Sequence, residues 1–508
     1  MNLLSSTSVF SFYTLISRLL GYARDILIAV FLGASILADA FFVAFRLPNT
    51  FRRLFAEGTF NAAFIPSYTS EKIKGKKNGK RFADEVLLLL ILTLSFIVLL
   101  AEIFTPYLVY LIAPGFFDNT QKFNLAVEFT RITFPFLLFV SISSFFAGIL
   151  NSNNKFAAAA ATPIILNIIL ILSLLLSYFL NLDFAKNLSY GVTLSGIVQL
   201  IFLVFFTQRY YKPSIKFKNQ ISFKIKLFLK KLFPSIFSSG VTQINILIGT
   251  IIASFEAGAV SYLYYADRVY QINLAIAGIA VGTVSLPILS KAIQLNNLKK
   301  ITNIQNKSIE LSLMLSIPAS LGLIFAAEEI VNSLFGYGSF SENDAKLTAN
   351  ALKYFGFGIP AFALVKVLSN LFFARNNTKT PFHLSLFIVL LNTIISLSFF
   401  KEVGFIIIPI STSISTWCGI FIYVYLLRKY EILTLENYFF KNTLKIISSS
   451  ILMTLILLWG LEFFSESLNY LNNFKSIYLL FIIFFVATIY LISCYLLGVL
   501  KVKNYKIR

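Results

Sequence analysis

The chain has 508 residues, of which 57% are hydrophobic and only 13% are charged. A soluble globular protein carries about 25% charged residues, so this composition excludes soluble enzymes, disulfide-rich secreted domains and disordered scaffolds. The formal net charge is +21, from 43 Lys and Arg against 22 Asp and Glu. Such an excess would suggest nucleic acid in a soluble protein, whereas this composition predicts an all-α polytopic membrane protein.

Apolar stretches long enough to cross a bilayer as a helix, about 20 residues each, recur along the whole chain. We predict roughly fourteen membrane-spanning helices, with approximate centres at Ile16, Phe51, Leu94, Leu138, Ile169, Gln199, Leu247, Ala280, Ser316, Ala363, Val389, Thr416, Thr454 and Val486. The segment Met1–Tyr13 lacks a cationic region and a clear cleavage site. We therefore interpret it as the start of a retained helix rather than a signal peptide.

Basic residues collect in alternate loops, which is how Lys and Arg mark the cytoplasmic side of a membrane protein. They follow predicted helices 2, 6, 8, 10 and 12 and fill the tail, within residues 72–81, 209–231, 291–307, 375–379, 428–429 and 501–508. The intervening loops are short or acidic, with Asp118, Asp183, Glu256, Glu328 and Glu466. We therefore predict that both termini are cytoplasmic, and nucleic acid is not needed to explain the charge.

Predicted helices 4 and 10 carry the same series of motifs, which indicates an internal repeat. Helix 4 has Phe134-Pro135, then Phe145-Phe146-Ala147 and Asn153-Asn154-Lys155, and helix 10 has Ile359-Pro360, then Phe372-Phe373-Ala374 and Asn376-Asn377-Thr378-Lys379. Parallel repeats of this kind build transporters that rock around a central site. We predict an N-terminal lobe (1–210), a basic cytoplasmic linker (211–232), a C-terminal lobe (233–430), and two further helices with a basic tail (431–508).

Ionisable residues inside the predicted spans are informative because a charge at the bilayer centre costs roughly 2.5–3.5 kcal/mol. The predicted spans contain Arg18, Arg24, Asp25, Asp39, Arg46, Arg52, Arg53, Glu57, Asp267, Arg268, Lys353 and Lys366. The planar guanidinium of Arg suits phosphate, because it donates two parallel hydrogen bonds and stays charged. We therefore interpret Arg18, Arg24, Arg52 and Arg268 as candidate ligand-binding residues in a water-filled cavity.

Structural explanations compete with this interpretation for several of these residues. Arg53 and Glu57 have the i,i+4 spacing of an ion pair, Asp25 could be the counter-charge of Arg18, and Arg46 could reach toward an interface. Arg18 and Arg24 lie about 120° apart on an ideal helix. Gly21 and Pro48 would permit bends near the arginines, which favours a cavity.

The sequence gives little support for a metal site, a disulfide, ATP hydrolysis or a site for a coupling ion. His383 is the only histidine, which excludes His-based metal sites, and Cys418 and Cys494 fit packed thiols better than a disulfide. No phosphate-binding loop pattern is present, so we predict neither a cofactor nor ATP hydrolysis. Predicted helices 7 and 11 contain no Asp or Glu, so a carboxylate site there for Na⁺ or H⁺ is unsupported.

Five blocks of the chain match a family pattern. The segments 17–25, 38–49, 52–58, 264–268 and 366–368 read SRLLGYARD, ADAFFVAFRLPN, RRLFAEG, YYADR and KVL. This pattern resembles the MurJ (MviN) family of bacterial lipid II flippases over nearly the whole chain. Two departures are Arg46, where Lys is common, and the missing carboxylates of helices 7 and 11.

The resemblance implies the MOP-type exporter fold, with two parallel six-helix lobes and two helices that form a lipid-tail groove. It implies a transporter, not an enzyme, that moves undecaprenyl diphosphate carrying a disaccharide-pentapeptide from the cytoplasmic to the periplasmic leaflet of the inner membrane. It places Arg18, Arg24, Arg52 and Arg268 in the central cavity and makes Asp39 important. We expect Asp25, Arg53, Glu57, Asp267 and Lys366 to support them.

Three other functions stay open at this point. The chain could export another polyprenyl-diphosphate-linked glycan on the same fold, act as a membrane glycosyltransferase on lipid II, or serve as a structural scaffold. A scaffold gives no reason to bury so many arginines. We expect a monomer whose partners are lipid II and membrane lipids, and a contact with the cell-wall synthesis machinery is open.

Overall fold

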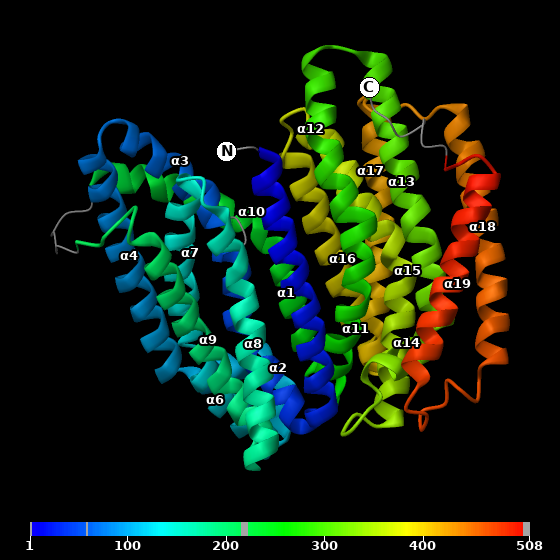
Figure 1. The fold of residues 1–508 in the computed structure, drawn as a ribbon, viewed down its shortest axis with the longest axis horizontal. Coiled ribbons are helices and arrows are strands. Elements are labelled where there is room, and N and C mark those ends of the chain that lie inside the picture. The colour runs from blue at the N-terminus through cyan, green and yellow to red at the C-terminus, as the bar shows by residue number, and fades with distance from the viewer. Residues whose placement is uncertain (1–2, 57–58, 215–221, 501–508) are drawn as a thin grey trace. The chain divides into compact units, whose positions relative to one another are not determined.

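The computed structural model describes residues 3–56, 59–214 and 222–500. Within these ranges all regular secondary structure is helical. The chain divides into two compact units, Met1–Ser261 and Tyr262–Arg508 (Figure 1).

Unit 1 consists of ten α-helices and a short 3-10 helix in its described part, and ends in the first turn of α11. In chain order these are α1 (Leu3–Leu32), α2 (Ile36–Ala56), α3 (Thr59–Ile73), α4 (Lys76–Ile103), α5 (Thr105–Ile112), η1 (Pro114–Asp118), α6 (Thr120–Thr133), α7 (Phe136–Ser152), α8 (Phe156–Leu180), α9 (Phe184–Thr207) and α10 (Phe223–Ala253).

Unit 2 contains the rest of α11 and the helices that follow it. These are α11 (Ala259–Leu274), η2 (Ala275–Ala280), α12 (Val281–Gln294), α13 (Leu298–Phe325), α14 (Ala327–Phe335), α15 (Glu342–Phe373), α16 (Lys379–Val403), η3 (Gly404–Ile406), α17 (Ile407–Lys429), α18 (Asn437–Phe463) and α19 (Lys475–Leu496).

Ten helical stretches of the described chain are long and apolar enough to cross a membrane, and one of them, Lys379–Lys429, contains both α16 and α17. Each of the predicted span centres lies inside a helix, although α1, α2 and α10 are outside the ten stretches. The chain is therefore an all-α multi-pass membrane protein, as predicted. The count of fourteen spans stays a prediction.

One detail of the prediction for helix 11 is wrong. The corresponding helix, α16, continues to Val403 and so includes Glu402 in its last turn. Glu402 is exposed, at the end of the helix rather than among its apolar turns. The sequence pattern left Glu402 out of the helix because Lys401 and Glu402 interrupt the apolar run.

Aromatic side chains form much of the core of unit 1. The Phe64 ring on α3 lies 5.2 Å from Phe60, 5.1 Å from Phe145 on α7 and 6.2 Å from Phe82 on α4, measured between ring centroids. Phe228 on α10 packs edge-on against Phe60 and Phe82. The first half of α10 is thereby held in unit 1 by α3 and α4.

The two copies of the predicted repeat end in the same type of turn. Asn154 and Asn376 both adopt a left-handed backbone, with φ of 58° and 59°, and the amide that follows each one bonds a carbonyl five residues back, at Leu150 or Phe372. This is a common way to end a helix. The proline positions differ, because Pro135 separates α6 from α7 whereas Pro360 lies inside α15.

Unit 2 contains a π-helical turn, η2, between α11 and α12. Gly278 in this turn lies so close to α15 that a Cβ there would come within 2.9 Å of the Ala363 Cα. The Ser312 hydroxyl on α13 donates to the Ala277 carbonyl at 3.0 Å, which satisfies a backbone group of the turn. Further along the chain, α18 and α19 pack side by side (Figure 1).

Carboxylates on α4 hold both ends of the connection between α9 and α10. Asp84 accepts hydrogen bonds from the Tyr211 hydroxyl at 2.5 Å and from the Ser214 amide at 3.0 Å. Glu85 accepts one from the Ser222 hydroxyl at 2.5 Å. These contacts attach the basic connection to α4 at its start and at its end.

Glu71 on α3 adds an ionic contact to the start of α10. It forms ion pairs with Lys224, in the first turn of α10, and with Lys74, whose Nζ lies 2.7 Å from Oε1. These two ammonium groups, Lys224 foremost, lower the pKa of Glu71. The carboxylate therefore stabilises the fold above its unfolded-state pKa of about 4.3, and this contribution is lost as the pH falls through the lower folded-state value.

We predict that Glu71→Gln melts about 1 °C below the wild type at pH 7. It loses roughly 1 kcal/mol of ion-pair energy, and the unfolding entropy of about 2.1 cal/mol/K per residue converts this loss to about 1 °C for a chain of this length. The difference should shrink as the pH falls through the lowered folded-state pKa of Glu71, because the wild-type carboxylate then becomes protonated as well. Thermal unfolding of the full chain in detergent measures both. Glu342→Gln is the control, because its pair with Lys346 is exposed on both sides. Equal melting temperatures of Glu71→Gln and the wild type at pH 7 would contradict the prediction.

Candidate functional site

The two arginines of α1 lie in different environments. Arg18 is exposed, whereas Arg24 is 6% exposed, which agrees with their separation of about 120° around the helix. The helix continues from Leu3 to Leu32 through Gly21, so the predicted bend does not interrupt it. Gly21 faces Asn167 of α8, with the Nδ2 atom 3.6 Å from where a Cβ would be.

The buried Arg24 guanidinium is held by two neighbours. Its Nε and one terminal nitrogen donate to Asp25 Oδ1 at 3.0 and 2.7 Å, and the other donates to Asn167 Oδ1 at 2.9 Å. Asn167 in turn donates to the Ser17 carbonyl at 2.8 Å, which fixes the orientation of its amide. Asp25 therefore neutralises Arg24, its direct neighbour, and Asn167 holds the guanidinium against α8.

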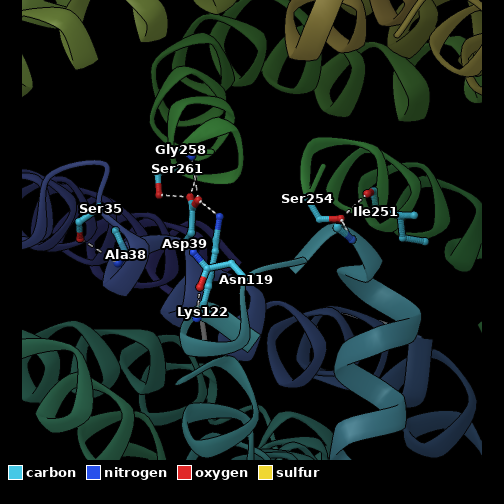
Figure 2. A network of polar contacts seen from close by, with 10 residues as sticks. Ser35, Ala38, Asp39, Asn119, Lys122, Ile251, Ser254, Gly258 and Ser261 are labelled. Atoms are coloured by element: carbon cyan, nitrogen blue, oxygen red, sulfur yellow. Dashed lines mark hydrogen bonds and ion pairs between the residues drawn. The ribbon is translucent and has the colours of Figure 1, made fainter. Parts of the chain in front are cut away.

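Asp39, in the first turn of α2, is fully buried and accepts four hydrogen bonds (Figure 2). Its Oδ2 accepts from Lys122 Nζ at 2.6 Å and from the Gly258 amide at 3.0 Å. Its Oδ1 accepts from the Ser261 amide at 2.9 Å and from the Ser261 hydroxyl at 2.6 Å. The carboxylate thus joins α2, α6 and the first turn of α11.

This network satisfies a buried charge in two ways. The amides of Gly258 and Ser261 belong to the N-terminus of α11, where unpaired N–H groups and the helix dipole favour an anion. Lys122 supplies the opposite charge and is itself 5% exposed, with its ammonium 4.0 Å from the centre of the Phe116 ring. Close by, the Ser254 hydroxyl accepts a hydrogen bond from the Gly115 amide at 3.0 Å.

Sequence reasoning missed Lys122 and Asn167. Lys122 stands four residues after the end of η1, in the first turn of α6. It looks like an ordinary loop lysine near Asp118 in the sequence, although it is the cation that pairs with Asp39. Asn167 is an uncharged residue in an apolar helix. The available signal was polarity inside an apolar stretch, since both residues lie in helices apolar enough to span a membrane.

The remaining candidates of α2 are half-buried. Arg52 donates from Nε to Asn49 Oδ1 at 3.0 Å, three residues earlier on the same helix. Arg53 and Arg46 are also half-buried on α2. Glu57 lies outside the described residues, so the Arg53–Glu57 ion pair stays a prediction.

Unit 2 carries the other candidates. Arg268 on α11 is half-buried and donates to the Tyr264 hydroxyl at 2.9 Å, with its guanidinium carbon 4.7 Å from the centre of the Tyr264 ring. Its neighbour Asp267 accepts a hydrogen bond from Gln271 one turn later. Lys366 on α15 is exposed. No group of three or more His, Cys, Asp or Glu side chains in the described residues could hold a metal ion.

Comparison with known proteins identifies the family. Residues 28–501 match the family described as "Lipid II flippase MurJ". The chain is 37% identical over 437 residues to a probable lipid II flippase MurJ of Rickettsia prowazekii, covering 85% of each protein. It is 31% identical over 516 residues to one of Buchnera aphidicola subsp. Baizongia pistaciae, covering 100% of each. The chain belongs to the MurJ lipid II flippase family.

Solved structures agree with membership in the MurJ family. A structure titled "Lipid II flippase MurJ, inward closed conformation" is 28% identical and superposes with a TM-score of 0.81, covering 95% of this chain and 97% of that one. An inward-facing multidrug transporter of the MATE family and MOP superfamily shares the fold at 16% identity, with a TM-score of 0.68 over 82% of this chain. The predicted MOP-type fold and the transporter class are therefore confirmed.

The Asp39–Lys122 pair predicts strong coupling between two substitutions. Asp39→Asn and Lys122→Met should each destabilise the protein by about 3–5 kcal/mol, because each leaves a buried group with its partner removed. The double variant should be less destabilised than the sum of the two. Denaturant or thermal unfolding of the four proteins tests this, with Lys186→Met as a control in the exposed pair with Glu128. Additive effects of the two substitutions would show that the pair is not an energetic unit.

Proposed function

We propose that this chain flips lipid II from the cytoplasmic to the periplasmic leaflet of the bacterial inner membrane by alternating access. Membership in the MurJ family and the lipid II flippase names of its relatives support this. The observation that carries the proposal is Arg18, an exposed guanidinium on a helix predicted to cross the membrane. A charged side chain in the hydrocarbon core of a membrane raises the free energy of the protein by several kcal/mol. A water-filled cavity that receives an anionic head group would keep the guanidinium hydrated or paired and so avoid this penalty.

The diphosphate of the substrate matches the chemistry of these side chains. We assign to Arg18, Arg24, Arg52 and Arg268 the binding of its oxygens, because guanidinium groups donate paired hydrogen bonds to phosphate. Asp25 and Asn167 position Arg24. The polyprenyl tail stays in the lipid while the head group passes through the cavity.

The remaining candidates support these arginines in the proposal. Arg53, Glu57, Asp267 and Lys366 have supporting roles near the candidate binding residues. A substrate contact for Asp39 stays a prediction. Its four internal hydrogen bonds favour a positioning role, in which it holds α2 and α6 to the start of α11.

The orientation follows from the basic loops. Lys and Arg concentrate in alternate loops and in the tail, so we place these segments and both termini in the cytoplasm. Most of the +21 charge then sets the orientation.

Reconstitution tests the proposed substrate. Purified full-length protein in vesicles should move labelled lipid II to the opposite leaflet, measured by its accessibility to a reagent that cannot cross the bilayer. A polyprenyl diphosphate carrying a different glycan is the matched substrate control and should move more slowly. Equal movement of both lipids would favour a general exporter of such glycans, and polymer formed from lipid II would reveal a glycosyltransferase. Either result, or no movement of lipid II, would contradict the proposal.

The membrane potential is the proposed driving force. Each negative charge moved outward across an inside-negative membrane gains roughly 2.3 kcal/mol per 100 mV, and α10 contains no Asp or Glu that would bind a coupling ion. Flipping should therefore rise with an imposed inside-negative potential and should not need a Na⁺ gradient. Vesicles with a potassium gradient and valinomycin set the potential. Transport that persists unchanged after the potential is collapsed would contradict this coupling.

A further inference from the structure

A crevice of about 570 Å³ lies in unit 1 between the α6–α7 junction, α8 and α9. Its volume is in the range of pockets that bury most of a small ligand, roughly 300–1,000 Å³. The lining is mainly apolar and includes Ile132, Pro135, Leu176, Leu194 and Ile197. The crevice is far along α6 from the Asp39 network and contains none of the residues assigned to lipid II.

The backbone explains why this space exists. Pro135 has no N–H and ends α6, so the chain begins a new helix at Phe136. The Ile132 carbonyl beside this break accepts a hydrogen bond from the Thr193 hydroxyl of α9. On the other side, Gly191 of α9 lies so close to α8 that a Cβ there would come within 2.4 Å of Ser173 Oγ. Small residues thus form part of the lining where the two helices meet.

The crevice opens on a surface suited to lipid. Leu176 and Leu194 line it and are 53% and 51% exposed, on two helices that are long and apolar enough to cross a membrane. Exposed apolar side chains on such helices face acyl chains. A hydrocarbon chain can therefore enter the crevice from the bilayer.

One side chain of the crevice lining is positively charged. Arg131 lines it and is exposed, and within the described residues it makes no hydrogen bond or ion pair. Of the nearby carboxylates, Glu128 is paired with Lys186 at 2.7 Å, and Glu102 of α4 interacts electrostatically with Arg131 without forming an ion pair. From Arg131 to Ser152 at the end of α7 the helical rise is roughly 30 Å, about the thickness of the hydrocarbon core. In the proposed orientation, Arg131 lies at the outer interface.

We propose that this crevice binds one anionic phospholipid of the outer leaflet. An acyl chain lies along Leu176, Leu194 and Ile197, and the phosphate accepts hydrogen bonds from the Arg131 guanidinium. Tyr190 is also in the lining, and tyrosines are common at head-group level. The charge and the apolar lining together match a lipid with a phosphate head group.

Phosphatidylglycerol is the probe for this site. The full-length protein is titrated with it in detergent, and lipid-bound protein is counted by native mass spectrometry. The wild type should retain one lipid in preference to phosphatidylcholine. Arg131→Gln should weaken retention by roughly tenfold or more, as expected for the loss of a charged hydrogen bond. Leu176→Trp, which fills the crevice, should abolish it.

Arg209→Gln is the matched control, because Arg209 is also exposed in unit 1 but lies beyond the other end of α9. It should retain phosphatidylglycerol as the wild type does. Equal retention by Arg131→Gln and the wild type would overturn the proposal, and so would displacement of phosphatidylglycerol from the crevice by undecaprenyl phosphate. Lipid II flipping is measured in parallel. Since Arg131 is outside the proposed transport residues, a failure of this site and a failure of the proposed function are distinguishable.

Discussion

A charge placed in an apolar helix has to be neutralised and hydrogen-bonded, because removing it from water costs several kcal/mol. The Asp39 network meets this constraint with one ammonium group, two backbone amides and a hydroxyl. All four donors come from elements far from Asp39 in the sequence, so they are available only when α2, α6 and the start of α11 are packed together. The packing of these three elements therefore depends on one fully buried carboxylate.

The same constraint separates the arginines of α1. Arg24 is buried and already satisfied by Asp25 and Asn167, so a phosphate has to compete with an internal carboxylate for it. Arg18 is exposed on another side of the helix and has a guanidinium that a ligand can reach without desolvating a core. This difference gives the two residues separate parts in the proposed binding of a diphosphate. Arg18 makes the first contact, and Arg24 offers a guanidinium whose orientation is already fixed by Asp25 and Asn167.

Much of the fold could be predicted because hydropathy and segment length indicate where the membrane-spanning helices lie. Every predicted span centre lies in a helix, and the repeated Asn residues after helices 4 and 10 adopt the same left-handed turn. The hydrogen-bond partners of Asp39 and Arg24 could not be predicted. Lys122 lies 83 residues from Asp39, Asn167 lies 143 residues from Arg24, and no local spacing in the sequence links either pair. Glu402 in α16 was missed for the opposite reason, because Lys401 and Glu402 are polar yet still helical.

The central claim is that arginines on membrane helices hold the diphosphate of lipid II. The most direct test is the binding of lipid II to the purified wild type and to Arg18→Ala, Arg24→Ala, Arg52→Ala and Arg268→Ala, with Arg209→Ala as the control outside the site. Loss of a charged hydrogen bond should weaken binding by roughly tenfold or more in the four variants and leave the control unchanged. Wild-type affinity in all four would contradict the claim.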